Sequence, residues 1–332
     1  MSLDPSLALA GALVGFLVGL TGMGGGALLT PLLVLVFGVP PLTAVSSDLV
    51  TSLVMKPFAG AVHLRRGTVH LRLFAWLAVG SVPAAFLASA AIGLLAGGSD
   101  GRALAGPLKI VIAIALLASV GAMIGRPLLD RARGSAGPIQ QRADADERPR
   151  VRPGATVLIG VVGGVAVGLT SVGAGSLVIA LLLLAYPRLR PRSLIGTDIV
   201  QAIPLVGAAA VGHLLFGDVH FALTASLLVG AIPGALIGAR LSASAPDRLV
   251  RPAMSAVLAA SALALLGAST PVLLGGATLT ALAISGTARL SGAATGRPAG
   301  VRRGRRSAGT VASTLPTGPG HPRPVVPAPA AD

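Results

Sequence analysis

Long apolar stretches with almost no charge dominate this sequence. Four of them cover residues 71–95, 104–124, 156–184 and 250–283. A helix needs about 20 apolar residues to cross the hydrocarbon core of a bilayer. Only 11% of the residues are charged, whereas soluble domains carry about 25%. The sequence therefore predicts an all-α, polytopic integral membrane protein.

A second feature is an internal repeat. The run Gly19–Gly26 (GLTGMGGG) aligns with Gly168–Gly175 (GLTSVGAG), and the alignment continues after a one-residue insertion. Polar residues then fall in register, which apolar composition alone would not produce, so we expect two homologous halves. The aligned pairs are Asp48 with Asp198, His63 with His213, His70 with His220, Gly80 with Gly230 and Pro83 with Pro233.

Arginine positions predict that the two halves have opposite orientations. The positive-inside rule places arginine clusters in the cytoplasm. The clusters lie at 65–72, 126–152, 188–192, 240–251 and 302–306. The corner His63–His70 is then cytoplasmic, whereas its mate His213–His220, which no arginine flanks, is outside. Inverted repeats of this kind are the architecture of many secondary transporters.

The predicted organisation follows from the repeat and the apolar pattern. A first transmembrane repeat covers 6–126, a cytoplasmic linker 127–153, a second transmembrane repeat 154–287 and a disordered basic tail 288–332. Each repeat begins with a broken hydrophobic segment, at 6–38 and at 155–187. Full spans are expected at 42–63, 72–96, 107–126, 194–216, 220–241, 253–268 and 271–287.

The glycine-rich breaks predict a substrate site. They leave half-segments, 27–38 and 176–186, that are too short to span a bilayer. Unwound backbone at membrane depth is tolerated where it lines an enclosed cavity, and helix N-termini facing a cavity favour an anion. The alternative is that these glycines serve only close helix packing. The predicted substrate-binding residues of the breaks are Gly22, Gly24, Gly25, Gly26, Ser171, Gly173 and Gly175.

Ionisable residues inside the apolar stretches add to this site. Asp48 and Asp198 are expected to carry a coupling proton or ion, because buried charges in membranes are costly and usually functional. The alternative is that each caps the N-terminus of its helix. Lys56 lies in mid-span and is the predicted partner of an anionic substrate, whereas Lys109 lies near a helix end and is expected to reach the interface. Gln201, close to Asp198, is a further substrate-binding candidate.

The histidine pairs allow two interpretations. They could titrate near neutral pH, but we expect them to hold the corners between helices by hydrogen bonding.

Several classes of function are excluded or disfavoured. The chain has no cysteine, so disulfides, thiolate metal sites and cysteine nucleophiles are ruled out. It has no Walker, HExxH or GxSxG motif, so neither ATP-driven nor proteolytic chemistry is indicated. We expect no catalytic residue, no metal and no cofactor. The net charge of +15 does not indicate nucleic-acid binding, because the arginines follow the positive-inside pattern.

The sequence resembles the sulfite exporter TauE/SafE family of membrane permeases over about residues 6–268. The residues that carry the resemblance are the run Gly15–Gly19, the glycine-rich break, Thr30-Pro31, Pro40, Ala44–Asp48, Gly60 to Gly67 and Gly80 to Pro83. The resemblance implies a bacterial plasma-membrane permease of eight or nine hydrophobic segments for sulfur-containing anions such as sulfite and organic sulfonates. Three features depart from it: Ala174 in place of the glycine seen at Gly25, Ala180 in place of the proline seen at Pro31, and the arginine-rich tail.

We therefore expect a secondary permease for a small anion, coupled to a proton or another ion. An intramembrane enzyme such as a lipid-phosphate phosphatase is one alternative. A structural or sensory membrane subunit, with a basic tail that binds lipid or a partner, is another. The expected partners are the anion and the lipid bilayer, not nucleic acid, and a homo-oligomer is left open.

Overall fold

The computed structural model describes residues 4–21, 25–65, 67, 69–98, 101–132, 151–173, 175, 177–186, 191–241 and 247–293. This part of the chain is almost entirely α-helical and contains no strand. The all-α prediction is therefore confirmed. The predicted tail from residue 294 onward and the central residues 133–150 lie outside the described residues.

The helices follow the order that the repeat predicts. The first half contains α1 (Pro5–Thr21), α2 (Gly26–Leu35), α3 (Pro41–Arg65), α4 (Leu71–Gly98) and α5 (Gly101–Ala132). The second contains α6 (Pro153–Thr170), α7 (Leu177–Ala185), α8 (Pro191–Phe216), α9 (Phe221–Leu241), α10 (Asp247–Leu265) and α11 (Thr270–Ala293). Both predicted breaks are present, since α1 and α2, and likewise α6 and α7, are separate helices.

Three helices extend six residues beyond their predicted spans: α5, α11 and α10, which begins at Asp247 instead of residue 253. Helix α5 covers Gly101–Ala132 instead of 107–126, and α11 runs to Ala293, past the predicted start of the tail at 288. The prediction used the apolar window alone, which measures the bilayer core. A helix continues into its polar flanks for as long as the backbone hydrogen bonds continue.

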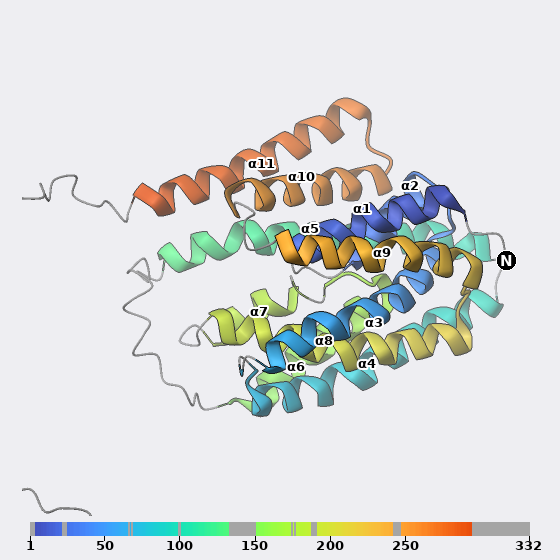
Figure 1. Ribbon diagram of the computed structural model, residues 1–332, viewed down its shortest axis with the longest axis horizontal. Coiled ribbons are helices and arrows are strands. Elements are labelled where there is room, and N and C mark those ends of the chain that lie inside the picture. Colours follow the sequence, from blue (N-terminus) through green and yellow to red (C-terminus); the bar gives the residue numbers. More distant parts are fainter. Residues whose placement is uncertain are drawn as a thin grey trace, which may run out of the picture. The chain divides into compact units, whose positions relative to one another are not determined.

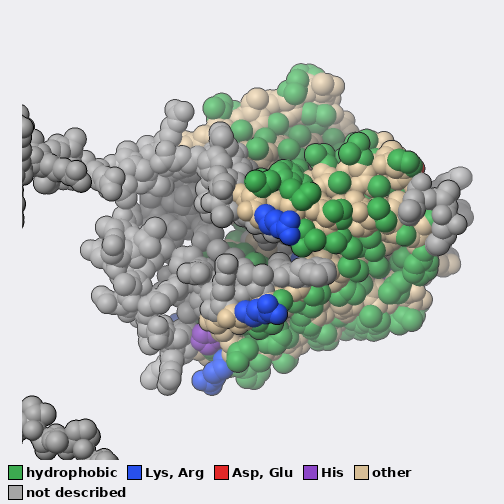
Figure 2. Space-filling view, viewed as in Figure 1, with side chains coloured by type: hydrophobic (Ala, Val, Ile, Leu, Met, Phe, Trp, Pro, Cys, Tyr) green, Lys and Arg blue, Asp and Glu red, His purple; other side chains and the backbone are tan. Residues whose placement is uncertain are grey.

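Five of the described helices are long and apolar enough to cross a membrane: α4, α5, α6, α8 and α9. Their outward side chains are apolar, as in Val79, Leu87, Ile114, Leu158 and Val229, each more than half exposed. In Figure 2, hydrophobic side chains are spread over the described part of the face in view. Such a surface suits lipid and would aggregate in water. The chain is thus a multi-pass membrane protein.

Equivalent helices of the two halves pack in equivalent ways. Helix α1 packs along α9, and its counterpart α6 packs along α4, the counterpart of α9. Helix α3 packs against its own counterpart α8, and α5 against α10. Figure 1 shows these helices with their axes roughly aligned.

Glycines permit the closest of these approaches. A Cβ added to Gly11 or Gly15 of α1 would overlap the carbonyl oxygens of Leu227 and Ala231 in α9. In the second half, a Cβ added to Gly160 or Gly164 of α6 would overlap the carbonyl oxygens of Leu77 and Ser81 in α4. Small residues four apart are a known device for bringing membrane helices into backbone contact. Close helix packing, the alternative role considered for the glycines of the breaks, is thus the role of these glycines within α1 and α6.

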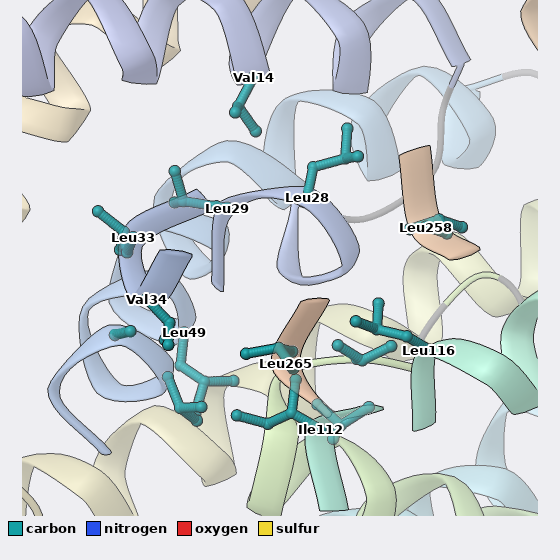
Figure 3. Packing of buried hydrophobic residues seen from close by; sticks show 14 of the residues in the cluster. Val14, Leu28, Leu29, Leu33, Val34, Leu49, Ile112, Leu116, Leu258 and Leu265 are labelled. Atoms are coloured by element: carbon teal, nitrogen blue, oxygen red, sulfur yellow. The ribbon is translucent and has the colours of Figure 1, made fainter. Parts of the chain in front are cut away.

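A hydrophobic core joins the halves around α2. Leu28, Leu29 and Leu33 of α2 are almost fully buried. They belong to one cluster with Val14 of α1, Leu49 of α3, Ile112 and Leu116 of α5 and Leu258 of α10, seen in Figure 3. A smaller cluster surrounds α7: Leu73, Leu77, Ile159, Val178, Leu182, Tyr186 and Leu194. Helix α2 is thus largely buried, whereas α7 buries Val178 and Leu182 and leaves Leu184 exposed. Protein contacts of this kind are the setting that broken membrane segments require.

Candidate functional site

The second break has an unusual backbone. Ser171, Gly173 and Gly175 have φ angles of 58°, 119° and 99°. Ser171 ends α6, and its N–H donates to the carbonyl oxygen of Val167 at 2.8 Å. Glycine adopts positive φ without the steric penalty of a Cβ, so two of the three positions have the residue that the turn favours. Helix α6 therefore ends here, and the two glycines allow the positive φ angles of the break.

The two breaks lie against each other. Gly26, the first residue of α2, contacts Ser171 so closely that an added Cβ would overlap the Ser171 carbonyl oxygen. A Cβ on Gly25 would lie 3.2 Å from the Ser52 Oγ and 3.5 Å from the Asp48 Oδ1. Three predicted site residues, Gly25, Gly26 and Ser171, are therefore brought together with Asp48. Gly22 and Gly24 lie outside the described residues.

Asp48 is a fully buried hydrogen-bond acceptor at this junction. Its Oδ2 accepts from the Thr30 hydroxyl of α2 at 2.7 Å, and its Oδ1 accepts from Ser52 at 3.3 Å. The Ser171 hydroxyl also donates to this carboxyl group. Asp48 therefore connects α3 to both breaks.

Asp198 is also fully buried, but its surroundings differ. Neither of its carboxyl oxygens accepts a hydrogen bond of good geometry from the described residues. The backbone N–H of Gly175 contributes a favourable interaction, and Lys56 contributes an electrostatic one. Asp198 thus faces the second break much as Asp48 faces the first, without the hydroxyl donors.

The capping alternative is wrong for both aspartates. Asp48 lies in the second turn of α3, which begins at Pro41, and Asp198 lies in the second turn of α8, which begins at Pro191. An N-cap residue precedes the first helical residue. Their burial therefore needs another explanation.

Lys56 of α3 is the basic residue that interacts with both aspartates. It interacts electrostatically with Asp198 and, less strongly, with Asp48. The side chain is partly exposed. Because Lys56, Asp48, Asp198, Thr30, Ser52 and Ser171 are linked by hydrogen bonds or charge, we call these six residues the central polar cluster.

Gln201 lies one turn after Asp198 on the same face of α8. Its Nε2 donates to the Ser81 hydroxyl of α4, and its Oε1 has no partner among the described residues. Gln201 therefore adds a free buried acceptor beside Asp198.

Thr30, Ser52 and Ser81 were not predicted as site residues. Ser52 follows Asp48 by four residues, a spacing that places both on one helix face and could have identified it. Thr30 and Ser81 are brought in by the packing of other helices, which no local pattern reveals.

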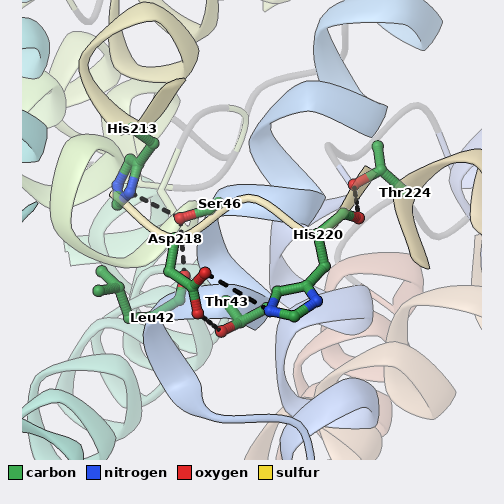
Figure 4. A network of polar contacts seen from close by, with 7 residues as sticks. All are labelled: Leu42, Thr43, Ser46, His213, Asp218, His220 and Thr224. Carbon is green, nitrogen blue, oxygen red and sulfur yellow. Dashed lines mark hydrogen bonds and ion pairs between the residues drawn. The ribbon is translucent and has the colours of Figure 1, made fainter. Parts of the chain in front are cut away.

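Hydrogen bonds of His213 connect helices of the two halves. His213 is fully buried; its Nδ1 lies 2.9 Å from the Ser46 hydroxyl of α3 and its Nε2 lies 2.9 Å from the Gly168 carbonyl oxygen of α6. Nearby, Thr43 donates to Asp218, whose carboxylate lies 3.5 Å from His220 (Figure 4). His213 therefore makes the expected hydrogen bonds, but among the described residues its ring joins α8 to α3 and α6 and makes no side-chain hydrogen bond across the α8–α9 corner. The side chain of His63 lies outside the described residues.

Comparison with known proteins gives consistent results. The family model described as "Sulfite exporter TauE/SafE" matches residues 7–265. The protein named "Probable membrane transporter protein YjnA" from Bacillus subtilis (strain 168) is 39% identical over 258 residues, which cover 78% of this chain and 98% of that relative. "Probable membrane transporter protein YdhB" from the same organism is 25% identical over 247 residues, 73% of this chain and 91% of the relative. No solved structure matches this chain.

The match covers the helices that form the central polar cluster, from α1 to the end of α10. The chain belongs to the sulfite exporter TauE/SafE family of membrane transporters.

Proposed function

We propose that this protein is a secondary permease that carries a small anion across the bacterial plasma membrane and couples its movement to a proton or ion gradient. The observation that carries the proposal is that Lys56, a partly exposed basic residue, interacts electrostatically with two buried aspartates, one from each half. This arrangement lies where the breaks of two homologous halves meet.

The charges of the cluster support anion binding linked to a cation. Lys56 and the N-terminal ends of α2 and α7 supply positive potential. Asp48 and Asp198 together exceed the charge of one lysine, and uncompensated buried charge is costly. A bound anion would make the cluster still more negative, so its binding favours the simultaneous uptake of a cation. This linkage is the physical basis of gradient coupling.

The matching packing of the two halves supports an alternating mechanism. The pairs α1–α9 and α4–α6 are equivalent under exchange of the halves. If the halves have opposite membrane orientations, as the arginine pattern predicts, then inward-open and outward-open states have similar structures and energies. The central polar cluster contains residues of both halves, and it is the site that we propose such an exchange opens alternately to each side.

Family membership supports sulfite or an organic sulfonate as the solute. The matching family is described as a sulfite exporter. The sulfite dianion and a sulfonate both present oxygens that accept hydrogen bonds from backbone N–H groups and from a lysine ammonium. The proposal assigns no catalytic role to any residue.

Flux measurements in proteoliposomes test this proposal. Labelled sulfite, a small sulfonate and sulfate are offered to vesicles containing wild type, Lys56→Ala or Lys109→Ala, with and without a pH gradient. Vesicles with wild type are expected to take up at least one of the sulfur anions faster than empty vesicles do. The flux through Lys56→Ala should be lower by a factor of about ten or more, which corresponds to a loss of about 1.4 kcal/mol in binding free energy. Lys109→Ala, the matched control in α5, should keep it. No flux above that of empty vesicles for any of these anions would contradict the proposed function.

A further inference from the structure

The two aspartates occupy equivalent positions in the repeat but are not equivalent chemically. Asp48 accepts hydrogen bonds from Thr30, Ser52 and Ser171. Asp198 accepts none of good geometry from the described residues. Both are fully buried, so the difference is not one of access to water.

The sequence explains the asymmetry. The repeat aligns Thr30 with Ile179 and Ser52 with Ala202. Both counterparts are apolar. Ala202 is buried and lies one turn after Asp198 on the same face of α8. The second half therefore keeps the carboxylate but lacks the hydroxyl groups that would hold it in the charged form.

Hydrogen-bond donors favour the charged form of a carboxyl group, whereas burial favours the neutral form. Asp48 has donors on both oxygens and can remain a fixed acceptor. Asp198 depends on the Gly175 N–H and on the charge of Lys56. When an anion binds Lys56, that counter-charge is diverted, and Asp198 is left as a buried carboxylate without compensation.

We propose that the coupling proton binds at Asp198 alone, while Asp48 is a positioning residue that ties the two breaks together. This inference rests on the proposed function, because it assigns the cation of the coupled cycle to one carboxyl group. Since the anion takes the Lys56 charge away from Asp198, the proton and the anion bind together. Both are then carried in the same direction.

The other titratable groups around Asp198 are few. On α3 they are Lys56, which interacts with Asp198 directly, and Asp48, which interacts with Lys56. His70 directly precedes α4 and Arg72 lies in its first turn; the backbone N–H of His70 donates to the Thr197 hydroxyl at 2.8 Å. The described helices α6 and α7 contain no titratable side chain. Among the described residues, Lys56 is the charged group that interacts with Asp198.

A proton fits this position better than a metal cation. Cations such as Na⁺ need several oxygen ligands. Among the described residues, the oxygen atoms on this face of α8 that lack partners are those of Asp198 and the Gln201 Oε1. One carboxyl group and one amide can exchange a proton but form a poor cage for a metal ion.

A matched pair of variants tests the assignment by transport. Asn imitates a permanently protonated Asp. The Asp198→Asn variant is expected to retain exchange of labelled anion between the two sides of a vesicle, but a pH gradient should no longer raise its uptake. The Asp48→Asn variant should keep the gradient response in whatever flux remains and should show a lower melting temperature. Gradient-driven uptake by Asp198→Asn, or wild-type uptake that depends on Na⁺ at constant pH, would overturn the inference.

Chemical labelling tests it without any transport. A hydrophobic carbodiimide reacts with protonated carboxyl groups in apolar surroundings, and mass spectrometry of the purified wild type locates the adduct. Asp198 is expected to react at least ten times faster than Asp48, and faster at pH 6 than at pH 8. Equal reaction of both, preference for Asp48, or no reaction at Asp198 would contradict the inference. If wild type moves no anion but Asp198 still reacts selectively, the proposed function fails and the proton site stands.

A transfer of the donors gives a further control. Ile179→Thr combined with Ala202→Ser places hydroxyl groups around Asp198 at the positions that Thr30 and Ser52 occupy around Asp48. This variant, checked for folding by its melting temperature, is expected to label at Asp198 at least five times more slowly than wild type. Unchanged labelling in a folded variant would show that the missing donors do not control Asp198.

Discussion

Single side chains connect the two halves of this protein at buried positions. His213 is the clearest case, because its two ring nitrogens contact the Ser46 hydroxyl of the first half and the Gly168 carbonyl oxygen of the second. Water cannot replace these contacts in the interior, so losing the ring leaves two polar groups unsatisfied. His220, which aligns with His70 and not with His213, is mostly exposed.

Replacement of His213 should therefore be destabilising. His213→Ala is expected to lower the free energy of unfolding by about 2–4 kcal/mol, since a buried side chain and two hydrogen bonds are lost. His220→Ala, the exposed control, should change it by less than about 0.5 kcal/mol. Thermal melting in detergent measures both. Equal effects of the two substitutions would show that His213 does not hold the helices as described.

Removal of the Thr30 hydroxyl from the central polar cluster should also destabilise the protein. Thr30→Val keeps the shape of the side chain but removes the donor to Asp48, which should cost about 1.5–3 kcal/mol because the acceptor is a buried carboxylate. Thr278→Val is the control, since the Thr278 hydroxyl is exposed and donates to carbonyl oxygens of its own helix. A melting temperature that falls equally in both variants would contradict the role of Thr30.

Site residues were predictable where the repeat or the cost of burial marked them. Asp48, Asp198 and Lys56 are rare ionisable groups in apolar spans, and Ser171 lies in an aligned break, so each was a candidate from the sequence. Thr30 was not, because hydroxyl groups are common in membrane helices and the contact of α2 with α3 is a tertiary event. The difference in hydrogen-bond donors between Asp48 and Asp198 depends on the packing of several helices, so the sequence alone does not reveal it.

At the scale of helices, the apolar pattern and the glycine runs predicted the order of elements and both breaks. The ends of α5 and α11 and the start of α10 were missed, because hydropathy measures the bilayer core and not the length of a helix. The pairing of α1 with α9 and of α4 with α6 could not be read from the sequence, since GxxxG spacing marks a packing face but not its partner.

The glycine contacts of these pairs predict a strong position dependence. Gly164→Ala should destabilise the protein by about 1–3 kcal/mol, because the new methyl group would overlap the Ser81 carbonyl oxygen and push α6 away from α4. Gly121→Ala in α5 is the control, since a Cβ there meets nothing within 4 Å. Alanine favours helix over glycine, so the control should be neutral or stabilising. Melting temperatures of the two variants test this prediction. An unchanged melting temperature for Gly164→Ala would contradict the close packing of α6 against α4.

At the scale of the whole molecule, the family match ends near α10, at residue 265. The cluster that the proposed function needs lies entirely within this matched region. Deletion of residues 296–332 is therefore expected to leave anion flux per folded protein within about twofold of wild type, a change of about 0.4 kcal/mol. Flux in reconstituted vesicles measures this, and loss of transport in a folded, truncated protein would point to the tail as a working part.

Opposite orientation of the two halves is the claim on which alternating access depends. Labelling of single cysteines with a membrane-impermeant maleimide in intact cells tests it directly, because the chain has no cysteine of its own. His70→Cys and His220→Cys place the label at equivalent corners, before α4 and before α9. We predict that His220→Cys reacts from outside, whereas His70→Cys reacts only after the cells are permeabilised. Reaction of both from the same side would contradict the inverted arrangement and, with it, the proposed mechanism.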